Sequence, residues 1–184
     1  MQRLIILIAL WLTACVTNSI SKMDNQAENS FGLALSPASL QQTLQLSQQL
    51  TITYNNQSHQ LDGLLEATPQ YVQIALVKFG RRILTLHFDG NKINVQKDAM
   101  VPQEIQPEQI LSDLQLAFWP YKSIVEKLPD NYTLVDEGNI RTLLFRNEVI
   151  SRIHYQSTEP HWQRIELTNL KFKYSMNIIS QSVS

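Results

Sequence analysis

The feature that most constrains the fold is a strict alternation of polar and apolar residues near the C-terminal end. The odd-numbered positions from 171 to 177 are polar, and the even-numbered positions around them are all apolar: Leu170, Phe172, Tyr174, Met176 and Ile178. Successive side chains of a β-strand point to opposite faces, so this period of two predicts a strand with one dry and one solvated face. Such a strand belongs to a sheet that covers an apolar layer on one side.

The same periodicity and several turn signals predict an antiparallel sheet along most of the chain. We expect strands at about residues 46–54, 61–67, 71–78, 82–88 and 92–97, and again at 132–136, 140–146, 148–157, 165–167 and 170–178. Glycines mark tight turns between several of these strands, because glycine adopts a positive φ without steric cost: Gly80, Gly90 and Gly138.

Two short helices are predicted between the two groups of strands. Pro107 suits the first helical position, and the apolar residues at 110, 111, 114 and 118 then share one face. Pro120 ends this helix, and a second helix follows to residue 128, just before Pro129. A further short helix is expected at residues 39–46, after Pro37.

Together these elements predict a mainly β (α+β) fold. A large antiparallel sheet twists and curls, and an apolar concave face must be covered by something. The helices at residues 107–128 are the candidates for this cover. We therefore expect an open antiparallel half-barrel of about ten strands wrapped over short helices.

Length, charge and cysteine content exclude several classes of protein. A chain of 184 residues suits one domain with a sizeable core. Its net charge of −1 gives no strongly basic surface for nucleic acid, so no nucleic-acid partner is expected. The single cysteine, Cys15, excludes an internal disulfide framework and a cysteine-based zinc site.

The N-terminal residues resemble a bacterial lipoprotein signal. Arg3 is followed by nine residues without charge or amide, which is far fewer than the roughly 20 residues of a membrane-spanning helix. We therefore expect residues 1–14 to be a cleaved signal peptide. The four residues that end in Cys15 resemble a lipobox, which implies a diacylglycerol on the sulfur of Cys15 and cleavage just before it. Two or more acyl chains give stable membrane anchoring.

The residues after Cys15 indicate how the protein is tethered and where it is sorted. Val16 follows the cysteine, and the absence of an aspartate there implies sorting to the outer membrane of a Gram-negative bacterium, with the domain facing the periplasm. Residues 15–39 are small and polar, so we expect a lipidated N-terminus and flexible tether, and a domain at residues 40–184.

No familiar catalytic pattern is present in the sequence. It lacks HExxH, GxSxG, GxGxxG and Walker motifs, and its four histidines have no zinc-site spacing: His59, His87, His154 and His161. We therefore expect no enzymatic activity, no cofactor and no metal. Trp119 and Trp162 could instead line an apolar pocket, with core packing as the alternative for Trp119.

Four stretches together carry a family resemblance: the lipobox, the Gly80-Arg81-Arg82 hairpin, residues 112–120 and residues 167–170. They resemble an uncharacterised family of Gram-negative lipoproteins often encoded beside aryl-polyene biosynthesis genes. That family looks like LolB, the outer-membrane receptor that, with its periplasmic partner LolA, handles lipoproteins in an open half-barrel. The resemblance implies outer-membrane lipid, an acyl or polyene ligand and a LolA-like carrier as partners.

The resemblance also implies a membrane-contact loop. LolB uses an exposed apolar residue on the hairpin between its third and fourth strands, and Phe79 holds the equivalent place here. Arg81 and Arg82 could then contact lipid phosphates. The alternative is a hairpin whose phenylalanine folds back on the sheet.

The predicted function is lipid binding and transfer. The apolar positions that could line a cavity, or equally form a core, are Leu84, Leu86, Phe88, Leu114, Phe118, Trp119, Val149, Ile153, Tyr155, Ile165, Leu167, Phe172, Tyr174 and Met176. The alternative function is a membrane-anchored scaffold that docks envelope or polyene-biosynthesis proteins and has no ligand of its own.

Overall fold

The computed structural model describes residues 32–101, 106–159 and 162–183. The segment from Gly32 to Ser184 forms one compact unit. The predicted signal peptide (1–14), the lipidation site Cys15 and the tether as far as residue 31 lie outside the described residues. No helix in the described part of the chain is long and apolar enough to cross a membrane.

Ten antiparallel strands form a single sheet with the order β5-β4-β3-β2-β1-β10-β9-β8-β7-β6. Their bounds are β1 (Leu44–Tyr54), β2 (Gln57–Ala67), β3 (Val72–Lys78), β4 (Arg81–Phe88), β5 (Ile93–Lys97), β6 (Tyr132–Glu137), β7 (Ile140–Phe145), β8 (Glu148–Glu159), β9 (Trp162–Asn169) and β10 (Tyr174–Ser182). The first strand, β1, pairs with the last, β10, so both halves of the chain join at the centre of the sheet.

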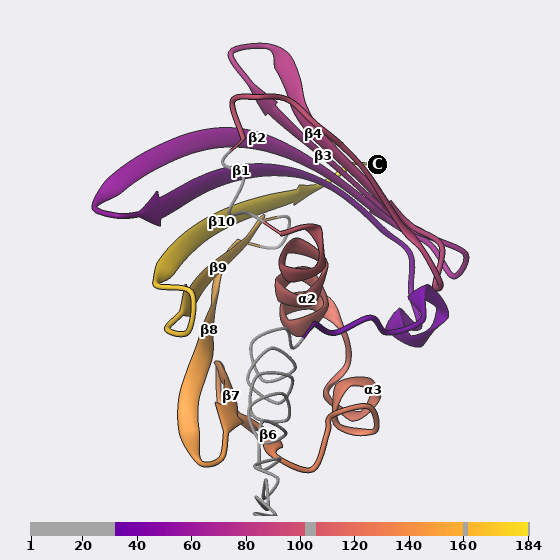
Figure 1. Ribbon diagram of the computed structural model, residues 1–184, viewed down its shortest axis with the longest axis vertical. Coiled ribbons are helices and arrows are strands. Elements are labelled where there is room, and N and C mark those ends of the chain that lie inside the picture. Colours follow the sequence, from indigo (N-terminus) through magenta and orange to yellow (C-terminus); the bar gives the residue numbers. More distant parts are fainter. Residues whose placement is uncertain (1–31, 102–105, 160–161, 184) are drawn as a thin grey trace, which may run out of the picture. The chain divides into compact units, whose positions relative to one another are not determined.

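The sheet does not close, because β5 and β6 are its two ends and are not paired with each other. Figure 1 shows the strands curving around α2 (Pro107–Phe118). The prediction of a mainly β fold with about ten antiparallel strands in one unclosed sheet is confirmed. Two smaller helices complete the unit, η1 (Pro37–Leu40) and α3 (Tyr121–Val125).

Residues with positive φ form the tight turns between strands. The predicted turns at Gly80, Gly90 and Gly138 are confirmed, with φ of 73°, 95° and 61°. Two consecutive positive-φ residues form the two-residue turn after β1 and the one after β3, as expected for turns that match the twist of a hairpin. In the turn after β3 the first of these residues is Phe79, with φ 52°.

Several predicted boundaries are wrong. The strands predicted at 61–67 and 165–167 are too short, since β2 is Gln57–Ala67 and β9 is Trp162–Asn169, and the last strand continues to Ser182. The helix expected at residues 39–46 ends at Leu40, because Gln41 adopts a left-handed φ of 63° and β1 begins at Leu44. The second central helix ends at Val125 instead of residue 128. The last strand begins only at Tyr174: the side chain of Asn169 accepts a hydrogen bond from the Phe172 amide at 3.0 Å and stabilises a turn there.

A short N-terminal strap, which we define as residues 32–36, packs beside α2. Leu33 and Leu35 are 4% exposed. The Gln115 side chain accepts from the Leu35 amide at 2.9 Å and donates to the Leu35 carbonyl at 2.8 Å, while Ser112 Oγ accepts from the Leu33 amide. The prediction that residues 32–39 belong to the flexible tether is therefore wrong, and the compact unit begins before residue 40.

Candidate functional site

The candidate site is the inner face of the sheet, which we define as the face that carries the buried side chains opposite α2. Register places apolar residues of four neighbouring strands in one row, with Leu50 opposite Ile178, Ile178 opposite Ile165, and Ile165 opposite Tyr155. Directly opposite residues share a face of the sheet. The next row in the same phase includes Met176, Leu167 and Ile153, which were also predicted for this face.

The fourteen predicted cavity residues differ in how far they are covered. Seven are buried and form core: Leu84, Leu86, Phe88, Trp119, Ile153, Ile165 and Leu167. Six keep partial exposure: Leu114, Phe118, Val149, Tyr155, Tyr174 and Met176. The last, Phe172, lies in the turn before β10 and is 39% exposed, so it does not belong to the inner face. Val149 pairs with Leu144, which alternates with the buried Leu143, so it lies on the other face of the sheet. The other five half-buried side chains offer apolar surface to a ligand.

Helix α2 contributes an apolar stripe that is only half covered. Ile110, Leu114 and Phe118 are spaced four residues apart, so they follow one side of the helix, and all three are half-buried. Other sides of the helix are closed by protein, since Leu111 is fully buried and Leu116 is 3% exposed. The stripe therefore lies beside the part of α2 that packs against the sheet.

A buried carboxyl group connects α2 to the sheet beside this stripe. Asp113 is 5% exposed, and its Oδ2 accepts a hydrogen bond from the Tyr174 hydroxyl of β10. Its Oδ1 lies 2.9 Å from Gln109 Nε2 and 3.4 Å from Asn169 Nδ2. Burial raises the pKa of Asp113 to about 7. Asp113 was not among the predicted site residues, although a carboxylate between the apolar positions of a helix is a usable signal.

Arg141 binds the C-terminal end of α2. This residue is 7% exposed, and its Nη1 donates to the main-chain oxygens of Leu116 at 2.8 Å and Trp119 at 2.9 Å. Its Nε and Nη2 donate to the two carboxylate oxygens of Asp136, both at 2.8 Å. A cation here satisfies carbonyls that the helix leaves unpaired and complements the helix dipole. No local sequence pattern indicates this contact.

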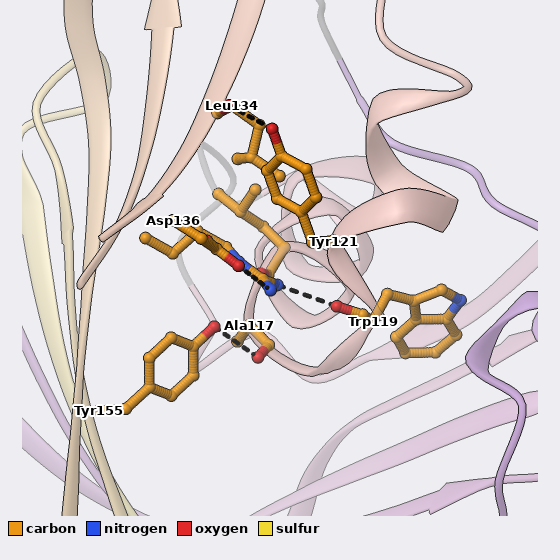
Figure 2. Close-up of polar contacts among 8 residues, drawn as sticks. Ala117, Trp119, Tyr121, Leu134, Asp136 and Tyr155 are labelled. Atoms are coloured by element: carbon orange, nitrogen blue, oxygen red, sulfur yellow. Dashed lines mark hydrogen bonds and ion pairs between the residues drawn. The ribbon is translucent and has the colours of Figure 1, made fainter. Parts of the chain in front are cut away.

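Two tyrosines add contacts around the same helix end. Figure 2 shows the Tyr155 hydroxyl pointing at the main-chain oxygen of Ala117, to which it donates at 2.9 Å. Burial raises the pKa of Tyr155 to about 12. The Tyr121 hydroxyl donates to the Leu134 carbonyl at 3.2 Å, which joins α3 to β6. Strand residues therefore bind α2 through its main chain at this end.

Trp119 lies in the core, so core packing, and not an apolar pocket lining, is the correct alternative for this residue. The residue is 1% exposed, and its indole nitrogen donates to Ser39 Oγ at 3.0 Å. Ser123 Oγ donates to the Ser39 carbonyl at 2.9 Å. These two hydrogen bonds join Ser39 of η1 to Trp119, just after α2, and to Ser123 of α3. Trp162 is 38% exposed at the start of β9.

The turn between β3 and β4 exposes the predicted contact residue. Phe79 is 90% exposed, so the alternative in which its ring folds back on the sheet is wrong. Lys78 Nζ lies 5.5 Å from the centre of the Phe79 ring. Arg81 forms an ion pair with Asp98 at 2.7 Å, and Arg82 is exposed beside it. An exposed phenylalanine among three basic residues suits an anionic, partly apolar surface.

Chemistry-bearing residues do not gather elsewhere in the described part of the chain. No group of three or more His, Cys, Asp or Glu side chains there could hold a metal ion. His154 lies 2.6 Å from the amide nitrogen of Asn139, and His87 stacks on Tyr71 with ring centres 5.4 Å apart. Both histidines therefore have ordinary neighbours on the sheet.

Most of the compact unit matches a known protein family. One protein-family model matches residues 45–182, which extend from the start of β1 to the end of β10. No curated protein matches the chain.

Proposed function

The chain belongs to the family described as "Protein of unknown function (DUF3261)", and we propose that it binds an apolar chain of a lipid on the inner face of its sheet beside α2. The observation that carries this proposal is partial exposure. Leu114 and Phe118 of α2 and Tyr174 and Met176 of β10 are apolar or aromatic side chains that the protein leaves half covered in an unclosed sheet.

A lipid chain is the ligand that gains most from such a surface. Each methylene group removed from water contributes about 0.8 kcal/mol, so a long acyl or polyene chain binds without any directed polar contact. The site offers matching chemistry, because the half-buried stripe of α2 is apolar along its length. Polar groups beside it are already engaged: Asp113 binds Tyr174, and the Tyr155 hydroxyl binds Ala117.

The proposal places the protein at the outer membrane as a lipoprotein like LolB, anchored through Cys15. The lipobox-like sequence that ends at Cys15 supports this anchor. Sixteen residues, 16–31, separate the cysteine from the compact unit. At up to about 3.5 Å per residue, such a segment can keep the unit within a few tens of ångströms of the bilayer.

Transfer to the membrane would use the β3–β4 turn. Phe79 is the most exposed large apolar side chain of the described residues, and Arg81 and Arg82 follow it. A ring inserted among lipid headgroups, with basic groups at the phosphates, would hold the domain against the bilayer. The cargo, received from a LolA-like carrier in the periplasm, would then move down an affinity gradient without covalent chemistry.

Ligand binding is tested directly with the chain from Val16 onward, which carries no lipid anchor. Native mass spectrometry with palmitate and with an aryl-polyene carboxylic acid should detect one-to-one complexes. Leu114→Gln should weaken them, because it places an amide in the apolar stripe, whereas Leu64→Gln should not, because Leu64 is 54% exposed on β2 and lies on the opposite face. Absence of any complex would overturn the proposal.

A scaffold function is the second candidate, and the burial of half the predicted cavity residues favours it. Leu86, Ile153 and Ile165 are 0% exposed, so this part of the interior is filled by protein. A scaffold would bind no lipid chain, and affinity purification of the anchored protein would recover an envelope or polyene-biosynthesis protein. The mass-spectrometry experiment separates the two functions.

A further inference from the structure

A second turn at the same end of the sheet has the same composition as the Phe79 turn. The β9–β10 turn contains Leu170, Lys171, Phe172 and Lys173. Leu170 is 51% exposed and Phe172 is 39% exposed. In both turns a lysine precedes the phenylalanine and lies near its ring, with Lys171 Nζ 5.8 Å from the centre of the Phe172 ring. Neither 78–82 nor 170–174 contains an acidic residue.

Strand pairing places these two turns at one end of the sheet. Tyr54, the last residue of β1, pairs with Gln57 across the β1–β2 turn and with Tyr174 at the start of β10. The β9–β10 turn therefore lies next to the β1–β2 turn, as Figure 1 also shows. Strand β3 runs antiparallel to β2, so it ends at this same end, where Lys78 leads into the Phe79 turn.

Turns at the opposite end of the sheet include acidic residues. Its turns include Asp89 after β4 and Glu137 at the end of β6, next to Asp136. The Asp89 carboxylate accepts hydrogen bonds from the amides of Asn91 and Lys92, which lower its pKa and keep it charged. Basic residues and exposed apolar side chains are thus combined in the Phe79 turn and the β9–β10 turn, where the neighbouring Asp98 pairs with Arg81. The β4–β5 turn at the other end contains both Asp89 and Lys92.

We propose that the Leu170–Lys173 turn is a second membrane-contact point, so that the domain rests on an anionic bilayer through two turns at one end of its sheet. This inference rests on the proposed function, because it extends the membrane contact assigned to Phe79. Basic residues near an anionic bilayer attract its surface, and aromatic rings favour the headgroup region. The local fold of the turn does not require the exposed Phe172 ring, because Asn169 stabilises the turn through the Phe172 main-chain amide.

The test measures co-flotation of the chain from Val16 onward with two kinds of vesicle. One is pure phosphatidylcholine, and the other contains about a quarter phosphatidylglycerol. We expect at least about tenfold stronger binding to the anionic vesicles, with a loss of binding as salt is raised. Phe172→Ser and Phe79→Ser should each weaken binding about tenfold. Leu64→Ser, at a similarly exposed apolar residue on β2, should leave binding unchanged.

Each other outcome has a distinct meaning. If Phe79→Ser weakens vesicle binding and Phe172→Ser does not, the second contact point is wrong and the first remains. Equal binding to the phosphatidylcholine vesicles and the anionic vesicles would overturn the proposal that the partner is an anionic bilayer. If a photo-crosslinker at position 172 captures a protein and no lipid in intact cells, the turn is a protein-docking site and the proposal is wrong. Acyl-chain binding in solution, measured separately by mass spectrometry, tests the proposed function itself.

A double variant tests the basic residues of this turn separately from its apolar side chains. The double variant Lys171→Gln, Lys173→Gln keeps both apolar side chains and should weaken binding to the anionic vesicles about tenfold while leaving the weaker binding to phosphatidylcholine unchanged. If this variant binds both vesicles like the unaltered chain, basic residues of the turn do not contact lipid, and the proposal is overturned.

Discussion

Arg141 Nη1 on strand β7 lies 2.9 Å from the main-chain oxygen of Trp119, just after the last residue of α2. The same guanidinium forms a two-point ion pair with Asp136 on the neighbouring strand β6. Helix α2 is thus attached to the outermost strands of the sheet by a buried cation. The same half of the helix is attached to the strap through Gln115, and its middle is attached to β10 through Asp113.

Replacing Arg141 by alanine should destabilise the fold by about 2–3 kcal/mol, because the main-chain oxygens of Leu116 and Trp119 lose their buried donor. The charge left on Asp136 adds little to this loss, since its side chain is 37% exposed to solvent. The free energy of unfolding from urea titration measures this loss. Arg152→Ala on β8 is the matched control, since Arg152 is exposed, and it should change stability by less than about 0.5 kcal/mol. Equal effects of the two variants would show that Arg141 does not hold α2.

Asp113 should make the fold less stable at higher pH. Its pKa is about 7 in the folded protein, against an ordinary value of 3.8, because burial disfavours the carboxylate. Below pH 3.8 the group is protonated in both states and has no effect. Between pH 4 and 7 the unfolded chain ionises first, so stability falls as pH rises, by roughly 4 kcal/mol in total. Above pH 7 both states are ionised and the loss is complete.

Asp113→Asn tests this account because asparagine is neutral at every pH and can still accept a hydrogen bond from Tyr174. Urea titrations at pH 4.5 and pH 8 should show that the variant gains stability over the unaltered chain mainly at pH 8. Asp130→Asn, at an exposed position, is the control and should give the same small difference at both values. A pH-independent effect of Asp113→Asn would contradict the raised pKa.

The sheet was predictable because its signals are local. Alternation and positive-φ turn residues mark most strands, and each hairpin joins neighbours in the sequence. Local signals also placed Phe79 at the tip of a hairpin, although its selection as a contact residue came from the resemblance to LolB. The contacts around α2 were not predictable, because Arg141 and Leu116 are 25 residues apart and Gln115 and Leu35 are 80 apart. Such pairs depend on how the sheet curves, which periodicity does not specify.

The first residues of the alternating pattern at 170–178 show a second limit of periodicity as a predictor. Residues 170–178 alternate throughout, yet the strand begins at Tyr174. Lys173 has a positive φ of 58°, and Asn169 binds the Phe172 amide, so a turn interrupts the pattern. Likewise, burial separates Ile153 from Met176 although both face inward, because burial depends on what covers each position. Alternation could therefore assign the face of the sheet but not separate core from open surface.

Gln115→Leu should release the strap. The Gln115 side chain is fully buried and satisfies both the amide and the carbonyl of Leu35, so leucine leaves two polar groups without partners. Each such group costs about 1–3 kcal/mol if it stays buried. We expect faster hydrogen exchange at the Leu35 amide and a lower midpoint in urea. Gln49→Leu, at an exposed position of β1, should change neither, and protection of Leu35 in the Gln115 variant would contradict this role.

Phe79→Asn should separate stability from membrane binding. Phe79 has a φ of 52° and is 90% exposed, so its ring adds little packing, and its backbone conformation is one that asparagine adopts more readily. The variant should therefore be more stable by about 0.5–1 kcal/mol in urea. Vesicle binding should nevertheless weaken, since the ring is lost.

Gly80→Ala is the complementary control for this turn. Gly80 has a φ of 73° and open space around it, so an added methyl group introduces backbone strain without a steric clash. This variant should lose about 1 kcal/mol of stability and keep vesicle binding, because Phe79 remains in place. The positive φ of Phe79 destabilises the fold, and its exposed ring gains no stability from burial. This combination is consistent with a function for the exposed ring. If Phe79→Asn proved less stable and bound vesicles normally, Phe79 would instead serve the hairpin itself.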